Sequence, residues 1–288
     1  LCTGGDVLKL VDKNKNIKKL QKKELEIMKY FNNFCEENNI KYYLAYGTLI
    51  GAVRHHGFIP WDDDVDVFVS GEDFLKLKEV FNKKVHNNKY FYQTLQTENN
   101  YYLLWDKVRL NDTIFVEEGW ENNDINNGIF IDIFPLLEYP DTEKEEKKFI
   151  RKYKFIRLLV EANINNNKSR YNNYGFIGKI LSKFIKILPQ VIRNKIVIKN
   201  IKYLCLYKSN SKYYYSLDEG LKIKFLKKPF ENIKTVKFED TNFNVPSDYH
   251  TNLIELYGDY MKLPPEEERI GHGKVYLSFG DDKDENKR

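Results

Sequence analysis

The chain has 288 residues, is 42% hydrophobic and 15% aromatic, and carries a formal net charge of +5. This length predicts one large domain or two small ones, and no apolar run reaches the ~20 residues that a membrane-spanning helix needs. The mild positive charge allows an anionic substrate, a lipid surface or nucleic acid and selects none of them.

The first 140 residues alternate between helical and strand patterns. Apolar residues recur at helical spacing in some segments, whereas short apolar runs bounded by turn residues indicate strands. In chain order we expect a helix at 17–38, a strand at 41–45, a short helix at 48–54, a strand at 65–69, a helix at 71–84 and strands at 91–95, 103–110, 113–116 and 128–134.

The rest of the chain is richer in helical patterns. We expect a charged helix at 141–162, an Asn-rich loop at 163–173, a helical zone at 178–204 broken at Pro189, strands within 212–245 and a helix within 246–260. The uneven alternation predicts an α+β fold with a mixed sheet. We assign a catalytic core to 17–140, a helical and strand extension that completes the active site to 141–277 and a disordered tail to 278–288.

An acidic cluster precedes the strand expected at 65–69. It contains Asp62, Asp63, Asp64 and Asp66. Side chains alternate faces along an extended chain, so Asp64 and Asp66 should point the same way, and Asp62 has the same parity. Clustered carboxylates raise one another's pKa unless a cation lies among them, and their oxygens suit Mg²⁺ or Mn²⁺. The pattern predicts metal-dependent phosphoryl transfer.

Asp132 interrupts the apolar strand expected at 128–134. An unpaired charge there would be costly, and a metal shared with Asp64 and Asp66 would explain it. The alternative is an aspartate that caps a turn or pairs with Lys or Arg. Both interpretations of Asp132 stay open, and the acidic cluster as a whole favours the metal site.

Basic and glycine residues around this cluster suit a phosphate. Gly47 and Thr48 open a short helix, whose N-terminal N–H groups can hold an anion, although many such pairs are simple caps. Arg54 can bind phosphate in a bidentate fork or lie in an ordinary surface loop. Lys107 and Arg109 share a strand face, where they neutralise a diphosphate or face solvent.

The segment 177–188 has apolar residues at helical spacing, with Lys179, Lys183 and Lys186 elsewhere on the helix. Such a helix can lie on a membrane surface as a peripheral contact, or it can pack on the core with its basic face in solvent. We favour packing on the core.

Residues 47–66 (GTLIGAVRHHGFIPWDDDVD) closely resemble the LicD family, which includes bacterial phosphocholine transferases and shares its core with fukutin and fukutin-related protein. Further similar segments are 105–113, 128–136 and 257–261, with Arg269 and His272. The resemblance covers roughly residues 20–277. It implies a nucleotidyltransferase-like fold, with a mixed-sheet core, flanking helices and a helical C-terminal extension.

The resemblance also implies roles for individual residues. Asp64, Asp66 and Asp132 correspond to the catalytic acids, and Asp62 joins them as a metal ligand. Substrate-binding positions are Gly47, Thr48, Arg54, Lys107, Arg109, Arg269 and His272. Two departures, Leu136-Leu137-Glu138 after Pro135 and Gly273 after His272, leave the transferred group and the acceptor open.

We therefore expect a Mg²⁺- or Mn²⁺-dependent transferase that moves a phospho-alcohol or related group from a CDP- or CMP-linked donor to a glycan hydroxyl, with the glycan lipid-linked or free. One alternative is a true nucleotidyltransferase that moves the nucleoside monophosphate itself. Another is a basic nucleic-acid-binding module, which the acidic cluster disfavours because carboxylates repel phosphate. We expect no nucleic-acid partner.

The cysteines bear on the compartment. Cys2, Cys35 and Cys205 are isolated, which argues against a disulfide framework and a cysteine-rich zinc site. With no visible secretory signal, we expect a cytoplasmic location, at the inner face of the membrane if the acceptor is lipid-linked.

Overall fold

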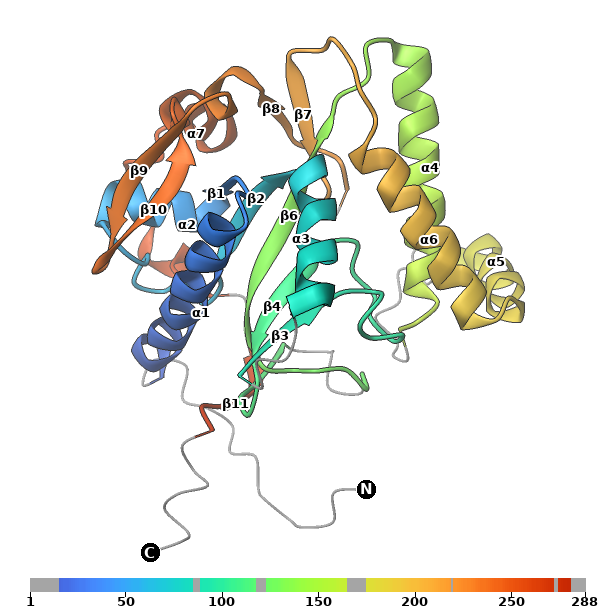
Figure 1. Ribbon diagram of the computed structural model, residues 1–288, viewed down its shortest axis with the longest axis horizontal. Helices are drawn as coiled ribbons and strands as arrows, with labels where there is room; N and C mark the ends of the chain where they lie inside the picture. The colour runs from blue at the N-terminus through green and yellow to red at the C-terminus, as the bar shows by residue number, and fades with distance from the viewer. Residues whose placement is uncertain are drawn as a thin grey trace, which may run out of the picture.

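The computed structural model of the chain describes residues 16–84, 89–117, 123–164, 175–218, 220–271 and 274–280. Within these residues, a seven-stranded sheet has the order β1-β2-β6-β4-β3, and β7 joins β6 to β8 (Figure 1). The strands are β1 (Tyr42–Leu44), β2 (Asp66–Ser70), β3 (Tyr90–Gln93), β4 (Asp106–Leu110), β6 (Ile129–Glu138), β7 (Tyr213–Ser216) and β8 (Lys224–Leu226). β2 and β6 run parallel and the other pairs antiparallel, which confirms the predicted mixed α+β architecture.

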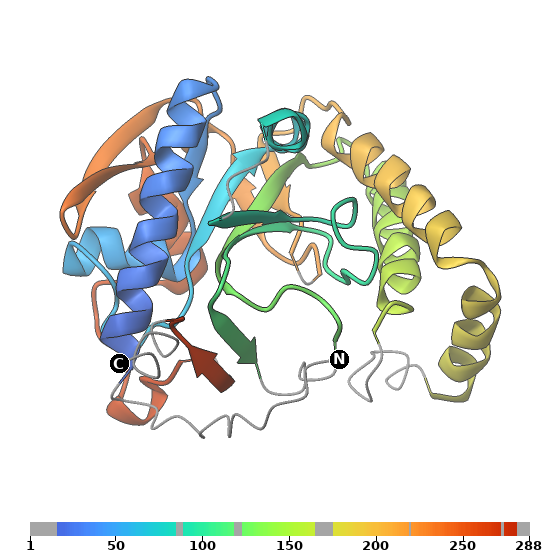
Figure 2. The same ribbon diagram turned by 60° about the horizontal axis from the view of Figure 1, so that its bottom comes forward.

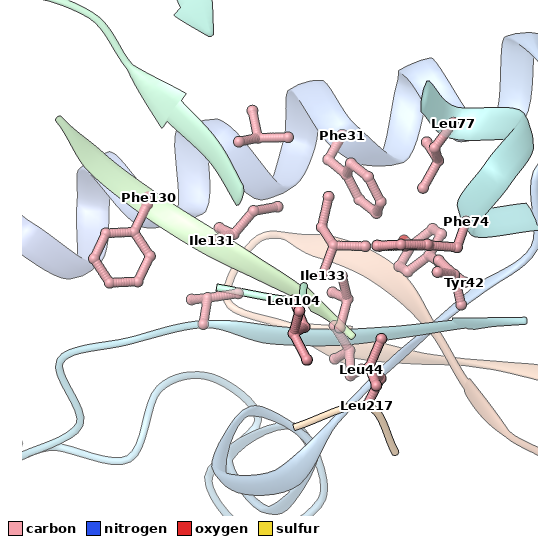
Figure 3. Packing of buried hydrophobic residues seen from close by; sticks show 14 of the residues in the cluster. Phe31, Tyr42, Leu44, Phe74, Leu77, Leu104, Phe130, Ile131, Ile133 and Leu217 are labelled. Carbon is pink, nitrogen blue, oxygen red and sulfur yellow. The ribbon is translucent and has the colours of Figure 1, made fainter. Parts of the chain in front are cut away.

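Two helices, α1 (Ile17–Glu37) and α3 (Gly71–Lys84), cover one face of this sheet. Both match their predicted ranges to within one residue. Figure 3 shows Phe31 of α1 and Phe74 of α3 packed with Ile131 and Ile133 of β6. Burial of these apolar side chains fixes the helices against the sheet, because apolar area removed from water stabilises the fold by about 25 cal/mol per Å².

The opposite face carries a smaller aromatic cluster. Phe68 of β2 and Phe134 of β6 meet Phe225 of β8 there, and the ring centroids of Phe68 and Phe225 are 5.0 Å apart. Because strand side chains alternate, residues two positions earlier in β2 and β6 lie on this same face. Those residues are Asp66 and Asp132.

The strand β6 continues beyond the predicted end at Phe134 to Glu138. It pairs with β4 through Ile133 and with β7 from Leu136. Pro135 lies at the change of partner, where its carbonyl accepts a hydrogen bond from the N–H of Leu217 (3.0 Å). A proline is tolerated here because that position needs no N–H donor to either antiparallel neighbour.

The remaining elements lie around the sheet. They are α4 (Glu143–Glu161), α5 (Gly175–Ile187), α6 (Gln190–Cys205), the β9–β10 hairpin (Ile233–Phe238 and Thr241–Pro246), α7 (Tyr249–Tyr257), and β5 (Ile114–Glu117) paired with β11 (Lys274–Ser278). Short 3-10 turns span Lys228–Phe230 and Glu266–Glu268. In Figure 2, α4 and α6 lie on one side of the sheet and the β9–β10 hairpin on the other.

The chain after residue 141 contributes strands as well as helices. It adds β7 and β8 to the central sheet and pairs β11 with β5. The predicted tail does not begin at 278, because Ser278 ends β11 and Phe279 is buried beneath Lys19. Residues 281–288 lie outside the described residues, as does most of the loop predicted at 163–173.

Candidate active site

The acidic loop, residues 62–66, runs into β2. Only Asp66 belongs to the strand, so the predicted strand start at 65 is one residue early. Burial nevertheless alternates along the loop: Asp62, Asp64 and Asp66 are partly exposed, whereas Asp63 is buried. The extended backbone therefore directs the three even-numbered carboxylates to one side before regular strand pairing begins.

Asp132 lies next to this loop across the parallel pair. Asp66 and Asp132 are register partners, and the N–H of Asp132 donates to the carbonyl of Val65 (2.8 Å). Burial raises the pKa of Asp66 well above its usual range, and the carboxylates of Asp64 and Asp132 raise it further. Asp62 adds to this effect. The structure brings together the four aspartates selected from the sequence.

Lys107 of β4 neutralises part of this charge. It is the register partner of Asp132, and its Nζ lies 2.9 Å from Oδ2 and 2.7 Å from Oδ1 of that carboxylate. Trp105 Nε1 donates to Oδ1 of Asp132 (2.7 Å). Asp132 is thus a carboxylate paired with Lys, one of the two interpretations that the sequence left open, and it still adjoins Asp66.

Lys107 and Arg109 share one strand face, as predicted. The ring of Phe130 lies under both, with its centroid 3.4 Å from Lys107 Nζ and 4.8 Å from Arg109 Cζ. Arg109 is buried, donates through Nη1 to the carbonyl of Gly128 (2.6 Å), and hydrogen-bonds through Nε to Gln93. Its guanidinium therefore braces neighbouring backbone, whereas Lys107 faces the acids.

The helix α2 (Tyr46–Ile50) begins two residues before its predicted start, and its N-cap is Ala45. Thr48 is therefore inside the helix and does not cap it. Its Oγ1 accepts a hydrogen bond from the N–H of Asp66 (2.9 Å), which ties α2 to the start of β2. A Cβ on Gly47 would come within 2.9 Å of Asp62 Oδ2, so glycine permits this close approach.

The entry into α2 is strained. Tyr46 has a positive φ of 43°, which is unusual for a bulky residue. Its hydroxyl donates to Asp218 (2.9 Å), and its ring packs against Phe68 and Phe134. Such strain persists where surrounding contacts hold the residue, and here it places Gly47 beside the acidic loop.

Arg54 is the penultimate residue of the π-helical turn η1 (Gly51–His55), which continues α2. Its Nη1 donates to the carbonyls of Tyr260 (2.5 Å) and Lys262 (3.3 Å), so it fastens the segment after α7. Partial burial lowers the pKa of this guanidinium.

The C-terminal segment lies over the acidic loop. The guanidinium carbon of Arg269 is 5.4 Å from the ring centroid of Trp61, and Arg269 Nε donates to the carbonyl of Pro264 (2.9 Å). A Cβ on Gly271 would come within 2.6 Å of Asp63 Oδ1. His272 lies outside the described residues.

Tyr257 was not among the site residues selected from the sequence. It ends α7, just before Gly258, whose φ of 62° terminates the helix. Burial raises the pKa of its phenol, and the carboxylates of the acidic loop raise it further. The available signal was its place in the segment 257–261, which was noted only as a family resemblance.

The donor set suits a hard cation, although its members are not gathered into a finished metal site. Within the described part of the chain, no three His, Cys, Asp or Glu side chains are arranged to hold a metal ion. Asp66 nevertheless lies beside Asp132 across the parallel strand pair, and its pKa is raised first by burial and then by the neighbouring carboxylates, whose repulsion a cation would relieve. All the candidate ligands are oxygens. The residues therefore fit Mg²⁺ or Mn²⁺ by chemistry and charge.

The chain was compared with known proteins. The profile described as "LicD/FKTN/FKRP, nucleotidyltransferase domain" matches residues 39–161, which contain the acidic loop and Asp132. The lipopolysaccharide cholinephosphotransferase LicD of Haemophilus influenzae is 30% identical over 272 residues, 86% of this chain and 92% of that protein. This chain belongs to the LicD family.

Further matches each cover less than a fifth of the chain. Uncharacterized protein RP689 of Rickettsia prowazekii is 46% identical over 55 residues, 19% of this chain and 21% of that protein. Human ribitol 5-phosphate transferase FKRP is 42% identical over 48 residues, 17% of this chain and 10% of that protein. These segments are too short to carry an argument about the whole chain, whereas the LicD match spans nearly all of it.

Proposed function

We propose that this LicD family member is a metal-dependent phosphotransferase that moves phosphocholine, or a similar phospho-alcohol group, from a CDP-linked donor to a hydroxyl of a cell-surface glycan. Support comes from the near full-length similarity to a lipopolysaccharide cholinephosphotransferase. The observation that carries the proposal is the acidic loop beside Asp132, in which burial, and then the surrounding carboxylates, raise the pKa of Asp66.

Asp62, Asp64, Asp66 and Asp132 are the proposed ligands of Mg²⁺ or Mn²⁺. When bound, the ion would neutralise phosphate charge and lower the pKa of the acceptor hydroxyl. Lys107 and Trp105 bind the carboxylate of Asp132. It therefore also positions Lys107 at the edge of the acidic loop.

The basic residues divide into two proposed roles. Lys107 is placed to neutralise charge on the donor phosphates, because its ammonium faces the same acids. Arg54 and Arg109 already donate to backbone carbonyls, so we propose that they act mainly by positioning. Arg269 lies above Trp61 at the entrance of the acidic loop, where its guanidinium can contact an anionic donor.

Gly47 and Thr48 position the loop in this proposal. Gly47 leaves room for the carboxylate of Asp62, and Thr48 holds the N–H of Asp66. Little covalent chemistry falls to the protein in phosphoryl transfer, where positioning and charge stabilisation dominate. A displaced loop would therefore lose activity even with every carboxylate present.

The test is CMP release from CDP-choline, CDP-ethanolamine and CDP-ribitol, each with a lipopolysaccharide or teichoic-acid acceptor. We expect CMP with at least one donor, loss of turnover in EDTA and recovery with Mg²⁺ or Mn²⁺. Turnover that persists in EDTA with a metal-free buffer would contradict the metal role. Absence of CMP with every donor and acceptor would contradict the transferase proposal.

A second candidate is transfer of the nucleoside monophosphate itself, which the nucleotidyltransferase description of the family favours. It would use the same acids but attack the other phosphorus of the donor. Mass analysis of the product separates the two reactions. A glycan that gains phosphocholine supports our proposal, whereas one that gains CMP supports nucleotidyl transfer.

A further inference from the structure

The helix α5 turns apolar side chains toward solvent. Phe176, Phe184 and Ile187 are 79%, 65% and 74% exposed, and Ile180 is also exposed. Among the α5 side chains that the structure describes, Ile185 is buried. Our expectation that this helix packs its apolar face on the core is therefore wrong for most of the described members of that face, since Ile180, Leu181, Phe184 and Leu188 are all exposed.

Four of these exposed residues form one stripe. At about 100° per residue, Phe176, Ile180, Phe184 and Ile187 fall within an arc of about 80° around the helix axis. The centre of this arc points about 140° away from the buried Ile185. In the same projection, exposed Lys183 lies about 20° beyond one edge of the stripe and exposed Lys186 about 80° beyond it. An apolar stripe bordered by lysines is the pattern of a helix that lies in a lipid interface.

The stripe continues across the turn into α6. Val191 and Ile192 are exposed at the start of α6. Arg193 secures the turn from inside, because its Nη1 donates to the carbonyl of Leu188 (2.6 Å) and its Nη2 to Oδ1 of Asn163 (3.0 Å). Figures 1 and 2 show α5 at the outer edge of the molecule, beyond α4 and α6. The surface is thus prominent and fixed by its own hydrogen bonds.

The charge of this region is one-sided. The sequence between Glu161 and Asp218 contains eleven Lys and Arg residues and no acidic residue. Exposed lysines follow α6 as well, at Lys195, Lys199 and Lys202. Each Lys or Arg near an anionic leaflet contributes about fivefold in affinity, so the region complements a negatively charged surface.

We propose that α5 and the first turn of α6 form a peripheral binding surface for an anionic lipid bilayer. The apolar stripe enters the headgroup region, and the flanking lysines contact lipid phosphates. A second copy of the chain is a poorer occupant, because a self-complementary contact would bring two strongly basic regions together. Insertion across the bilayer is not part of this proposal, since no helix in the described residues has the length and hydropathy to span one.

The test is flotation of the full chain with vesicles of phosphatidylcholine, with and without phosphatidylglycerol. We expect at least tenfold tighter binding to vesicles that contain phosphatidylglycerol, and weaker binding as salt is raised. A chain that does not float with either vesicle, or that binds both equally, overturns the proposal. This comparison of lipids uses the unaltered protein and needs no variant to fold.

Variants then locate the surface. Phe176→Ser with Phe184→Ser and Ile187→Ser, and separately Lys183→Glu with Lys186→Glu, should each weaken binding at least tenfold. The matched control is Ile233→Ser with Lys237→Glu, on exposed positions of β9, which should bind as the parent does. Equal loss in the control overturns the proposed location. So does a dimer, detected by light scattering, that the serine variant dissociates.

Discussion

Buried carboxylates on the two sides of β4 differ in the charge of their neighbours. On one face, Asp106 accepts hydrogen bonds from Lys78 Nζ (2.6 Å to Oδ1) and from the hydroxyl of Tyr92 (2.6 Å). On the other face, the next residue, Lys107, pairs with Asp132, which adjoins Asp66. Burial raises the pKa of both Asp106 and Asp66, but the neighbours differ in sign.

The neighbours of Asp106 lower its pKa, because Lys78 and Tyr92 favour the ionised form. The carboxylates near Asp66 raise its pKa further, and Lys107 opposes them. The first carboxylate is therefore partly compensated within the fold, whereas most of the charged neighbours of the second carry its own sign. This difference separates a structural ion pair from a site that needs a cation from outside.

The largest expected effect is on turnover. Asp66→Asn should lower the rate of CMP release about a thousandfold, because the variant removes a charged group from the centre of the proposed metal site. It should not unfold the protein, since it also removes carboxylate repulsion. The measurements are steady-state CMP release and the free energy of unfolding in urea.

Asp106→Asn is the matched control for that experiment. It removes one carboxylate from the same sheet, on the opposite face, and should retain most of the turnover. Equal losses of turnover in the two variants would show that the comparison between the faces is wrong.

The next effect is on stability. Lys78→Met should lower the free energy of unfolding by about 3 kcal/mol, because it leaves Asp106 buried without its cation. Turnover per folded molecule should stay close to that of the parent. Chemical denaturation measures the first quantity and CMP release the second.

A double variant tests whether the unpaired charge of Asp106 causes this loss of stability. Lys78→Met with Asp106→Asn should be less destabilised than Lys78→Met alone, because the unpaired charge is gone. If the double variant is instead the less stable of the two, lost packing of the lysine stem explains the result and the ion pair does not.

The pH dependence of the free energy of unfolding tests how burial and pairing with Lys78 balance at Asp106. Burial raises the pKa of Asp106 above its unfolded value of about 4, so the folded chain holds this proton more tightly. The resulting stabilisation is complete below the unfolded pKa and is lost as pH rises through the folded pKa. The free energy of unfolding of the parent minus that of Asp106→Asn should therefore fall as pH rises above about 4. A difference that rises with pH would mean that pairing with Lys78 outweighs burial.

Most of the fold could be predicted from the sequence because its elements have strong local signals. The helices at 17–38 and 71–84 repeat apolar residues at helical spacing, and α1 and α3 match them. Pro189 separates α5 from α6 as expected. The extension of β6 beyond Phe134 was missed because Pro135 normally ends a strand, and only the arrival of distant β7 makes the proline acceptable.

The site was predictable in part for a similar reason. Alternation along an extended chain is a local property, and it placed Asp62, Asp64 and Asp66 on one side. The salt bridge between Lys107 and Asp132 depends on strand register, which the sequence does not reveal. The exposed stripe of α5 was missed because helical spacing identifies an apolar face without saying what covers it.

Thr48 should give the smallest effect, and it tests how the acidic loop is held. Asp106 has a charged partner, whereas the N–H of Asp66 donates to a neutral hydroxyl. Thr48→Val removes that acceptor at nearly constant volume and should lower the free energy of unfolding by about 1 kcal/mol. Thr48→Ser retains the hydroxyl and is the matched control. If valine lowers turnover more than serine while both variants remain folded, this hydrogen bond positions Asp66. Equal loss of turnover in both variants would have separate causes, the missing methyl contact in serine and the changed polarity in valine. The hydrogen bond between α2 and β2 would then have no special part in the site.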